Sequence, residues 1–311
     1  MKVASLALPE LATALATTGI YLYTGPFLNH IRSGIPTVSE NIAQLYRDYE
    51  VSLQGDFADF HVSVDFPLGL RRWLRPQALF SFDGLIPFKP LPVDQAHPML
   101  EWGLNWCVSA HAHQYLIIHS AVLEKSGRAV IMPGMPGAGK STLSAALMSK
   151  GWRLLSDELA LLTLDSLNVS PLPRPISLKN KSIDIIGGFV PDAVFGRIAH
   201  DTAKGSVAHL RLTEDSVSKA QENALPTWIV FPRYQPETSA CLTAESKARA
   251  FMRLADNAFN YSLLGPKGFQ ALGRVVDASD CYDFVYSRLE DAIPIFDDLA
   301  SSPARPLTEQ K

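Results

Sequence analysis

Apolar and polar residues alternate in short runs over the first 95 residues of the chain. Residues 60–64 predict a strand, and residues 78–86 predict a hairpin that turns at Asp83-Gly84. Residues 38–49 carry apolar side chains at helical spacing, so residues 1–95 predict a small α+β domain, which we expect to recognise a substrate or partner. Four prolines interrupt residues 86–98, which predicts an irregular linker and a domain boundary near residue 95.

Beyond this linker, apolar runs of strand length alternate with helical patterns, so we predict an α/β domain over residues 96–300. Residues 301–311 are expected to form a disordered tail. The predicted helices are residues 99–112, 140–150, 246–263 and 289–299. The predicted strands are residues 115–124, 129–133, 152–155, 159–164 and 284–286.

The strands at residues 115–124 and 129–133 share a register that their short turn defines. With the turn at residues 125–128, Glu124 pairs with Ala129 and His119 lies opposite Gly134. A bulge would shift this register by one residue and turn His119 to the other face of the sheet. The alternative role for His119 is that of a core histidine bonded to a neighbouring carbonyl group.

Composition excludes several classes of protein. The 311 residues are 47% hydrophobic and 19% charged, as in globular proteins, and a net charge of −3 offers no basic field for sequence-independent nucleic-acid binding. The three cysteines are too far apart for a metal pair or a disulfide framework, which is typical of a reducing cytoplasm. Polar residues interrupt both the N-terminal apolar run and residues 102–123, so we expect a cytoplasmic protein with neither a signal peptide nor a membrane span.

A phosphate-binding motif lies between a predicted strand and a predicted helix. Residues 134–141 match GxxxxGK[ST], in which glycines let backbone N–H groups curve around a phosphate and the helix N-terminus adds its positive end. Lys140 can reach the outer phosphates, and the Ser141 hydroxyl can ligate Mg²⁺. The motif predicts binding of ATP with Mg²⁺ by Gly134, Met135, Pro136, Gly137, Ala138, Gly139, Lys140, Ser141 and Thr142.

An acidic pair, Asp157-Glu158, follows the next predicted strand, 17 residues after Lys140. A parallel strand beside the loop strand would place these carboxylates near the phosphates. There they could hold the metal or accept a proton from a hydroxyl nucleophile. The alternative is a solvated acidic turn.

Three basic residues are further candidates for contact with phosphate or substrate. Arg174 and Lys179 lie beyond the strand at residues 159–164, and Lys204 lies in a polar stretch that we interpret as a mobile loop. Solvated surface charge is the alternative for all three.

Three segments resemble the HPr kinase/phosphorylase superfamily, in particular the branch called HPr kinase-related kinase A. Ile118-His119-Ser120-Ala121-Val122 is similar to the family's Leu-His-Gly segment, and the phosphate loop follows it. Lys150-Gly151-Trp152-Arg153-Leu154-Leu155-Ser156-Asp157-Glu158 resembles the family's Gly-His-Arg-Leu-Val-Ala-Asp-Asp. The resemblance implies a phosphoenolpyruvate-carboxykinase-like P-loop kinase domain with a mixed sheet, acting as an ATP-dependent serine kinase.

The resemblance also implies roles for individual residues. Asp157 is expected to be the base toward a serine hydroxyl, His119 to orient it, and Glu158 to replace a second aspartate and help to hold the metal. Ser177 and Lys179 stand where the family has a Glu two residues before an Arg. The missing glutamate weakens the inference that the family's metal handling and phosphorolysis extend to this chain.

The branch's association with a small PqqD-like peptide-binding protein implies a peptide or small-protein substrate, and the parent family's hexamer implies a homo-oligomer. Two other functions remain open: a small-molecule kinase, and a nucleotide-binding regulator without transfer activity. Asp157 and His119 favour a kinase, because nucleotide binding alone requires neither residue.

Overall fold

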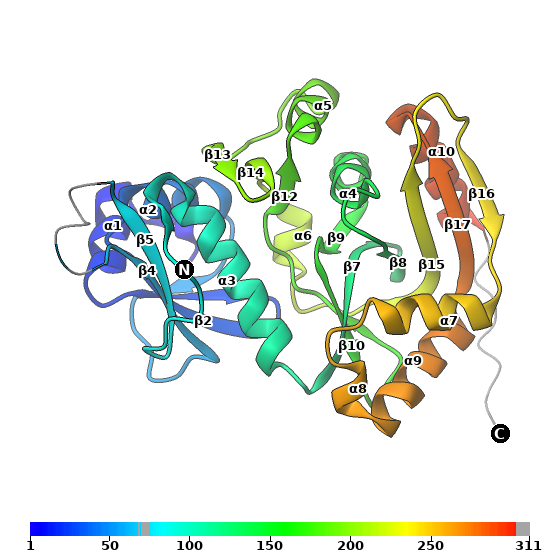
Figure 1. Cartoon of the computed structure of the whole chain (residues 1–311), viewed down its shortest axis with the longest axis horizontal. Coiled ribbons are helices and arrows are strands. Elements are labelled where there is room, and N and C mark those ends of the chain that lie inside the picture. The colour runs from blue at the N-terminus through cyan, green and yellow to red at the C-terminus, as the bar shows by residue number, and fades with distance from the viewer. Residues whose placement is uncertain (68, 70–74, 303–311) are drawn as a thin grey trace. The chain divides into compact units, whose positions relative to one another are not determined.

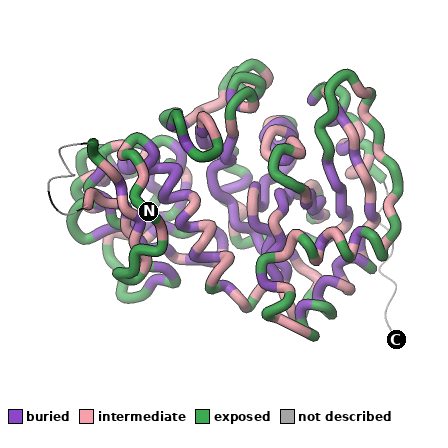
Figure 2. The backbone as a smooth tube through the Cα atoms, in the orientation of Figure 1, coloured by how far each residue is buried: buried purple, intermediate pink, exposed green. Residues whose placement is uncertain are grey.

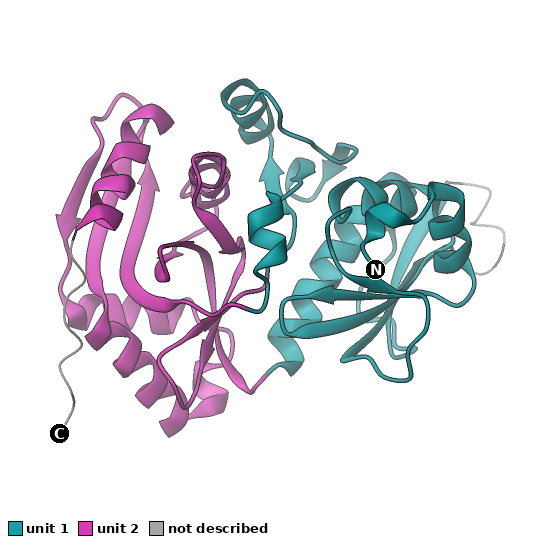
Figure 3. Cartoon of the chain, turned by 180° about the vertical axis from the view of Figure 1, so that it is seen from behind, with its two compact units in different colours: residues 1–112, 173–221 teal, residues 113–172, 222–311 magenta. Residues whose placement is uncertain are grey.

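The computed structural model describes residues 1–67, 69 and 75–302, which form a mixed α/β structure (Figure 1). The chain forms two compact units: unit 1 contains residues 1–112 and 173–221, and unit 2 contains residues 113–172 and 222–311 (Figure 3). The boundary expected near residue 95 lies inside unit 1, and a separate recognition domain over residues 1–95 stays a prediction. Of the tail expected over residues 301–311, residues 303–311 lie outside the described residues.

The described residues of the first segment of unit 1 form a mixed sheet and three α-helices. Its strands, in order across the sheet, are β3 (Val51–Ser52), β1 (Ile20–Thr24), β2 (Phe27–Arg32), β4 (Phe60–Asp65), β5 (Gln77–Phe82) and β6 (Leu91–Pro92). Its helices are η1 (Val3–Ser5), α1 (Leu8–Ala16), α2 (Pro36–Leu45), η3 (Val93–Gln95) and α3 (Ala96–His111). β2 and β4 pair in parallel, and the other neighbouring strands are antiparallel. The strand expected at residues 60–64 and the helix expected at residues 38–49 are confirmed, the helix ending earlier.

The proline-rich segment is more regular than its composition indicates. β6, η3 and the first turn of α3 all lie within residues 86–98, so the prediction of an irregular linker is wrong for residues 91–98. Pro98 falls in the first turn of α3, where the missing N–H has no helical partner to lose. The turn at Asp83-Gly84 is confirmed by a bridge between Phe82 and Leu85, but β5 then pairs with β6 rather than with residues directly after the turn.

The second segment of unit 1 forms a small antiparallel sheet in the order β12 (Ile176–Lys179), β14 (Gly205–Leu210) and β13 (Ala199–Thr202). Its helices are α5 (Lys181–Phe189) and α6 (Glu214–Ser218). A buried polar cluster joins this segment to the first. The carboxylate of Glu101 on α3 accepts a 2.6 Å hydrogen bond from the Tyr46 hydroxyl, and its other oxygen lies 3.5 Å from Nη2 of Arg174. Arg174 also donates to the Glu101 carbonyl at 3.0 Å, so this ion pair ties residues 173–221 to α3.

Unit 2 contains one long mixed sheet. Its main order is β11 (Val169–Ser170), β10 (Leu159–Thr163), β7 (Tyr115–Lys125), β8 (Arg128–Pro133), β15 (Leu225–Tyr234), β17 (Asp280–Tyr286) and β16 (Cys241–Ala244), with β9 (Arg153–Ser156) also paired to β7. The three strands β8, β15 and β17 are mutually parallel, and the other pairs are antiparallel. The strands are largely buried (purple in Figure 2), because helices cover both faces of the sheet.

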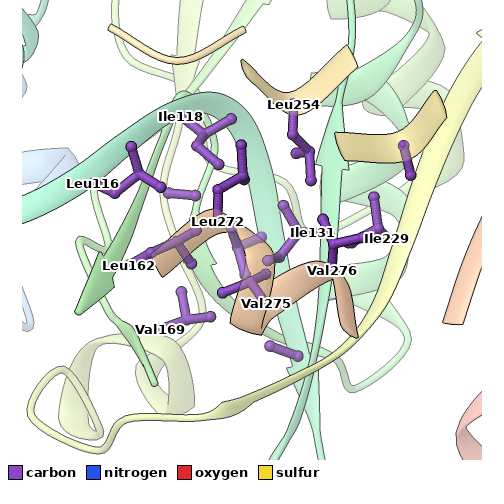
Figure 4. Close-up of a cluster of buried hydrophobic side chains, with 14 of the residues drawn as sticks. Leu116, Ile118, Ile131, Leu162, Val169, Ile229, Leu254, Leu272, Val275 and Val276 are labelled. Carbon is purple, nitrogen blue, oxygen red and sulfur yellow. The ribbon is translucent and has the colours of Figure 1, made fainter. Parts of the chain in front are cut away.

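One face of this sheet packs against α9 (Pro266–Ala278) and α7 (Lys247–Asp256). Leu116 and Ile118 of β7 alternate onto this face and meet Leu272, Val275 and Val276 in one buried cluster (Figure 4). The opposite face packs against α4 (Lys140–Ser149) and α10 (Leu289–Ser301), where Phe296 meets the rings of Trp152 and Phe284 edge-on. No helix within residues 1–67, 69 and 75–302 has the length and apolar character needed to cross a bilayer.

The helix expected over residues 246–263 is interrupted. α7 ends at Asp256, and a separate short helix, α8 (Tyr261–Leu264), follows. The backbone between them pairs with β7: the His119 amide donates to the Asn257 carbonyl at 2.8 Å, and the Phe259 amide donates to the Ile117 carbonyl at 2.9 Å. The prediction of one continuous helix is wrong because these groups bond to a strand that is distant in sequence.

Candidate phosphate-binding site

The loop between β8 and α4 has the backbone that the motif requires. Gly137 and Gly139 have φ angles of +87° and +90°, a region that disfavours side chains. A Cβ atom on Gly139 would lie 2.2 Å from the Tyr286 hydroxyl oxygen, so this position also lacks room for any side chain. The residue that begins α4 must therefore be preceded by glycine for two independent reasons.

The charge of Lys140 is held inside this loop. Its side chain is buried, and its ammonium group donates to the carbonyl oxygens of Gly134 and, at 3.5 Å, Met135. Ser141 and Thr142 occupy the first turn of α4, whose backbone N–H groups carry a partial positive charge. An ammonium group, a helix N-terminus and curved glycine backbone suit a polyphosphate. Ligation of Mg²⁺ by the Ser141 hydroxyl stays a prediction.

Two tyrosines on the neighbouring parallel strands fasten the loop. The Tyr234 amide donates to the Ala138 carbonyl at 3.1 Å, and the Tyr286 hydroxyl donates to the Gly139 carbonyl at 3.0 Å. Burial raises the pKa of Tyr286, so its hydroxyl remains a donor at neutral pH. Both residues were missed from the sequence, because no local pattern shows which strands will flank β8.

His119 lies on β7 beside the point where β8 ends. The expected register is confirmed: Glu124 pairs with Ala129, and Ser120 pairs with Pro133, the last residue of β8. The expected position of His119 opposite Gly134 is wrong, because the β7–β8 pairing ends at Ser120 and the His119 amide donates instead to the Asn257 carbonyl. The imidazole is partly exposed, and its centre lies 6.0 Å from that of the Phe259 ring.

The acidic pair lies on the other side of β7. The strands β9 and β10 both run antiparallel to β7, with partners Ser156–Val122 and Leu159–His119, so Asp157 and Glu158 fall opposite the β7 residues between them. The amide of Ser120 confirms this placement by donating to the Glu158 carbonyl at 3.1 Å. Asp157 is buried and Glu158 is partly exposed.

The expectation that the acidic pair follows a strand next to the loop strand is wrong, because β7 lies between β8 and β9. Since β8 and β9 are both antiparallel to β7, they still point the same way, and their C-terminal ends reach the same edge of the sheet. Two strand spacings amount to about 10 Å. The structure therefore places His119 on β7, with Gly134 directly after the neighbouring strand β8 and Asp157 directly after the neighbouring strand β9, and their catalytic roles stay predictions.

The three basic candidates all belong to unit 1. Arg174 is buried against Glu101, so the alternative of a solvated surface charge is wrong for it. Lys179 ends β12, and Lys204 is exposed with its ammonium 5.2 Å from the centre of the Trp102 ring. The polar stretch around Lys204 is a β13–β14 hairpin rather than a mobile loop. Contact of these residues with phosphate or substrate stays a prediction.

A cavity of about 880 Å³ adjoins the phosphate loop within unit 2. Its walls come from four separate stretches of the chain: the loop, the segment that runs from β15 to the edge strand β16, the segment that contains α7, and the end of β17. Sequence reasoning missed it for that reason. Within the described ranges, no three His, Cys, Asp or Glu side chains are grouped as a metal site.

Comparison with known proteins gives little further information. No family model and no curated protein matches the chain. Among solved structures, the chain is similar to the Hpr(Ser) kinase/phosphatase from Coxiella burnetii, with 12% identity and a TM-score of 0.26. The match covers 59% of this chain and 96% of the other. A TM-score this low does not establish a shared fold.

Proposed function

We propose that this protein is an ATP-dependent kinase that binds the triphosphate of ATP·Mg²⁺ in the loop of residues 134–142. The observation that carries this proposal is the Lys140 ammonium group enclosed by the loop carbonyls at the N-terminus of α4. The left-handed glycines and the tyrosine-fastened loop carbonyls support it, because they fix the backbone N–H groups before any ligand arrives.

The proposed reaction transfers the γ-phosphoryl group to a hydroxyl, taken to be a serine. The hydroxyl proton passes to the carboxylate of Asp157 as the new O–P bond forms, and the bond between the γ-phosphorus and the ADP oxygen breaks. His119 would orient the reacting groups. Ser141 and Glu158 would hold Mg²⁺, which neutralises the charge that develops on the phosphates.

The proposed acceptor is a peptide or small protein, brought with the help of a PqqD-like peptide-binding protein. Support for this acceptor is the resemblance of residues 118–122 and 150–158 to the kinase family named above. Intact-mass analysis of small proteins encoded nearby, after incubation with the protein and ATP, tests it. A gain of one phosphate on one of them is the expected result. ATP binding without transfer to any of them would favour the regulator.

Calorimetric titration with ATP·Mg²⁺ tests the nucleotide site itself. Lys140→Ala should weaken binding by about 10- to 100-fold, because a hydrogen bond to a charged group contributes about 1.5–3 kcal/mol. Lys150→Ala is the matched control, since Lys150 is an exposed lysine at the opposite end of the same helix. Unchanged ATP affinity in a folded Lys140→Ala variant would rule out the phosphate-loop assignment.

A further inference from the structure

Side chains from three neighbouring strands form one wall of the cavity beside the phosphate loop. Phe231, Asp283 and Thr243 are register partners on β15, β17 and β16, so their side chains form a row on one face of the sheet. Arg253 of α7 lies over this row, with its guanidinium carbon 3.6 Å from the centre of the Phe231 ring. Phe231 is buried, so the row starts from a fixed apolar surface.

Ion pairs hold Arg253 in this position. Its Nη1 donates to a carboxylate oxygen of Asp283 at 2.7 Å and lies 3.3 Å from one of Glu245. A guanidinium group fixed in this way offers a flat, positively charged surface on which an aromatic base can stack. The hydroxyl of Thr243 and the side chain of Gln235 add hydrogen-bonding groups to the same cavity.

The position of the cavity in the sheet separates it from the proposed catalytic carboxylate. Asp157 lies beyond β7 on one side of β8, whereas β15, β17 and β16 lie on the other side. In phosphoryl transfer the attacking and leaving oxygens are roughly in line with the phosphorus. If the acceptor approaches from the side of Asp157, the leaving nucleoside diphosphate extends toward the cavity.

We propose that this cavity binds the nucleoside portion of the nucleoside triphosphate, an inference that rests on the proposed kinase function. The cavity is lined in part by Gly134, Met135 and Ala138, which belong to the phosphate loop. A ligand whose phosphates occupy the loop can therefore extend directly into the cavity. The volume of about 880 Å³ lies in the range of small-molecule pockets and exceeds what a base and a ribose need.

The test compares a nucleotide with its phosphate chain alone. Affinities for ATP, GTP and inorganic tripolyphosphate, each with Mg²⁺, are measured by calorimetry for the wild type and for Thr243→Phe. The added ring fills the cavity from an exposed edge strand, where an aromatic residue is well tolerated. Ala244→Phe is the matched control, because the next residue of the strand points to the opposite face.

We expect Thr243→Phe to weaken binding of the preferred nucleotide by at least about tenfold while tripolyphosphate affinity changes less than about twofold. Ala244→Phe should leave both affinities unchanged. Unchanged nucleotide affinity in a folded Thr243→Phe variant overturns the cavity assignment, as does an equal loss for nucleotide and tripolyphosphate. Loss of acceptor phosphorylation with nucleotide affinity intact would indicate that the cavity binds the acceptor, and would also overturn the assignment of the cavity to the nucleoside. A wild type that binds neither ligand instead refutes the kinase proposal.

Discussion

The hydroxyl group of Tyr286 donates a 3.0 Å hydrogen bond to the carbonyl of Gly139. The last residue of β17 thus holds the glycine that directly precedes α4, although 147 positions separate them. The shape of the phosphate loop therefore depends on a strand that is completed late in the chain, and this dependence can be tested.

Gly139→Ala should abolish tight ATP binding. The new methyl group would meet the Tyr286 hydroxyl. The alanine backbone would also have to adopt a φ of +90°, which alone costs about 1–2 kcal/mol. Gly151→Ala separates the two effects, because Gly151 has a φ of +87° with no atom within 4 Å of the added Cβ. We expect Gly151→Ala to lower stability in urea titrations and to leave ATP affinity intact. Wild-type ATP affinity in Gly139→Ala would contradict the proposed loop geometry.

Asp157→Asn should reduce phosphate transfer by about 10²- to 10⁴-fold, the usual range for a positioned general base. ATP affinity should be retained, because Lys140 and the loop amides are unchanged. His119→Ala should lose less activity, since its role is to orient the reacting groups. Transfer assays and calorimetry on the same preparations check both variants. If Asp157→Asn transfers phosphate at nearly the wild-type rate, Glu158 becomes the next candidate for the base.

Breaking the buried ion pair of unit 1 should be costly. Arg174→Met leaves the Glu101 carboxylate buried without its cation and should lower the free energy of unfolding by about 3–5 kcal/mol. Removing both charges in Glu101→Leu/Arg174→Met should recover much of that loss. The exposed pair Lys2–Glu214 is the control, and Lys2→Met should show no measurable change in urea titrations. Equal losses in the single and double variants would contradict this account.

Unit 1 should lose stability in mild acid. Burial, and next the charge of Arg174, lower the pKa of His97 to about 3, and burial also holds the pKa of His209 well below its usual range. Nε2 of His97 lies 3.6 Å from a carboxylate oxygen of Glu101. This contact is not an ion pair, because the imidazole ring is neutral. Because these folded pKa values are lowered, the unfolded chain binds more protons below about pH 6.5, and stability is lost as the pH falls.

Between pH 7.5 and 5.5 each of these two histidines should lower the free energy of unfolding by about 1.4 kcal/mol. Urea titrations at both pH values measure the change. His97→Gln should reduce this pH dependence, whereas His200→Gln, at an exposed position in the same unit, should preserve it. An unchanged pH dependence in His97→Gln would contradict the assignment.

The parts of the fold that the sequence predicts are those that local chemistry determines. The hairpin of β7 and β8 follows from its short turn, and its register pairs Ser120, the neighbour of His119, with the last residue of β8. The spacing of the glycines and Lys140 predicts the phosphate loop. These predictions needed only residues that are near one another in the chain.

The parts that could not be predicted depend on distant partners. Amphipathic periodicity continues through residues 257–260, yet β7 binds that backbone and ends α7. β7 lies between β8 and β9 in the sheet. This strand order cannot be predicted from the sequence of β9, because it depends on which strand β9 pairs with. Tyr286 and the row that ends at Thr243 become part of the site only when the C-terminal strands join the sheet.

The division of unit 1 into two chain segments affects how the protein is made. Residues 1–112 leave the ribosome first, but their partner segment ends at residue 221. At about 5–20 residues per second, synthesis of residues 113–221 takes about 5 to 20 s. Until Arg174 has been synthesised the Glu101 carboxylate lacks its cation, and until residue 221 has been added the nascent chain presents an incomplete unit 1 to chaperones and proteases.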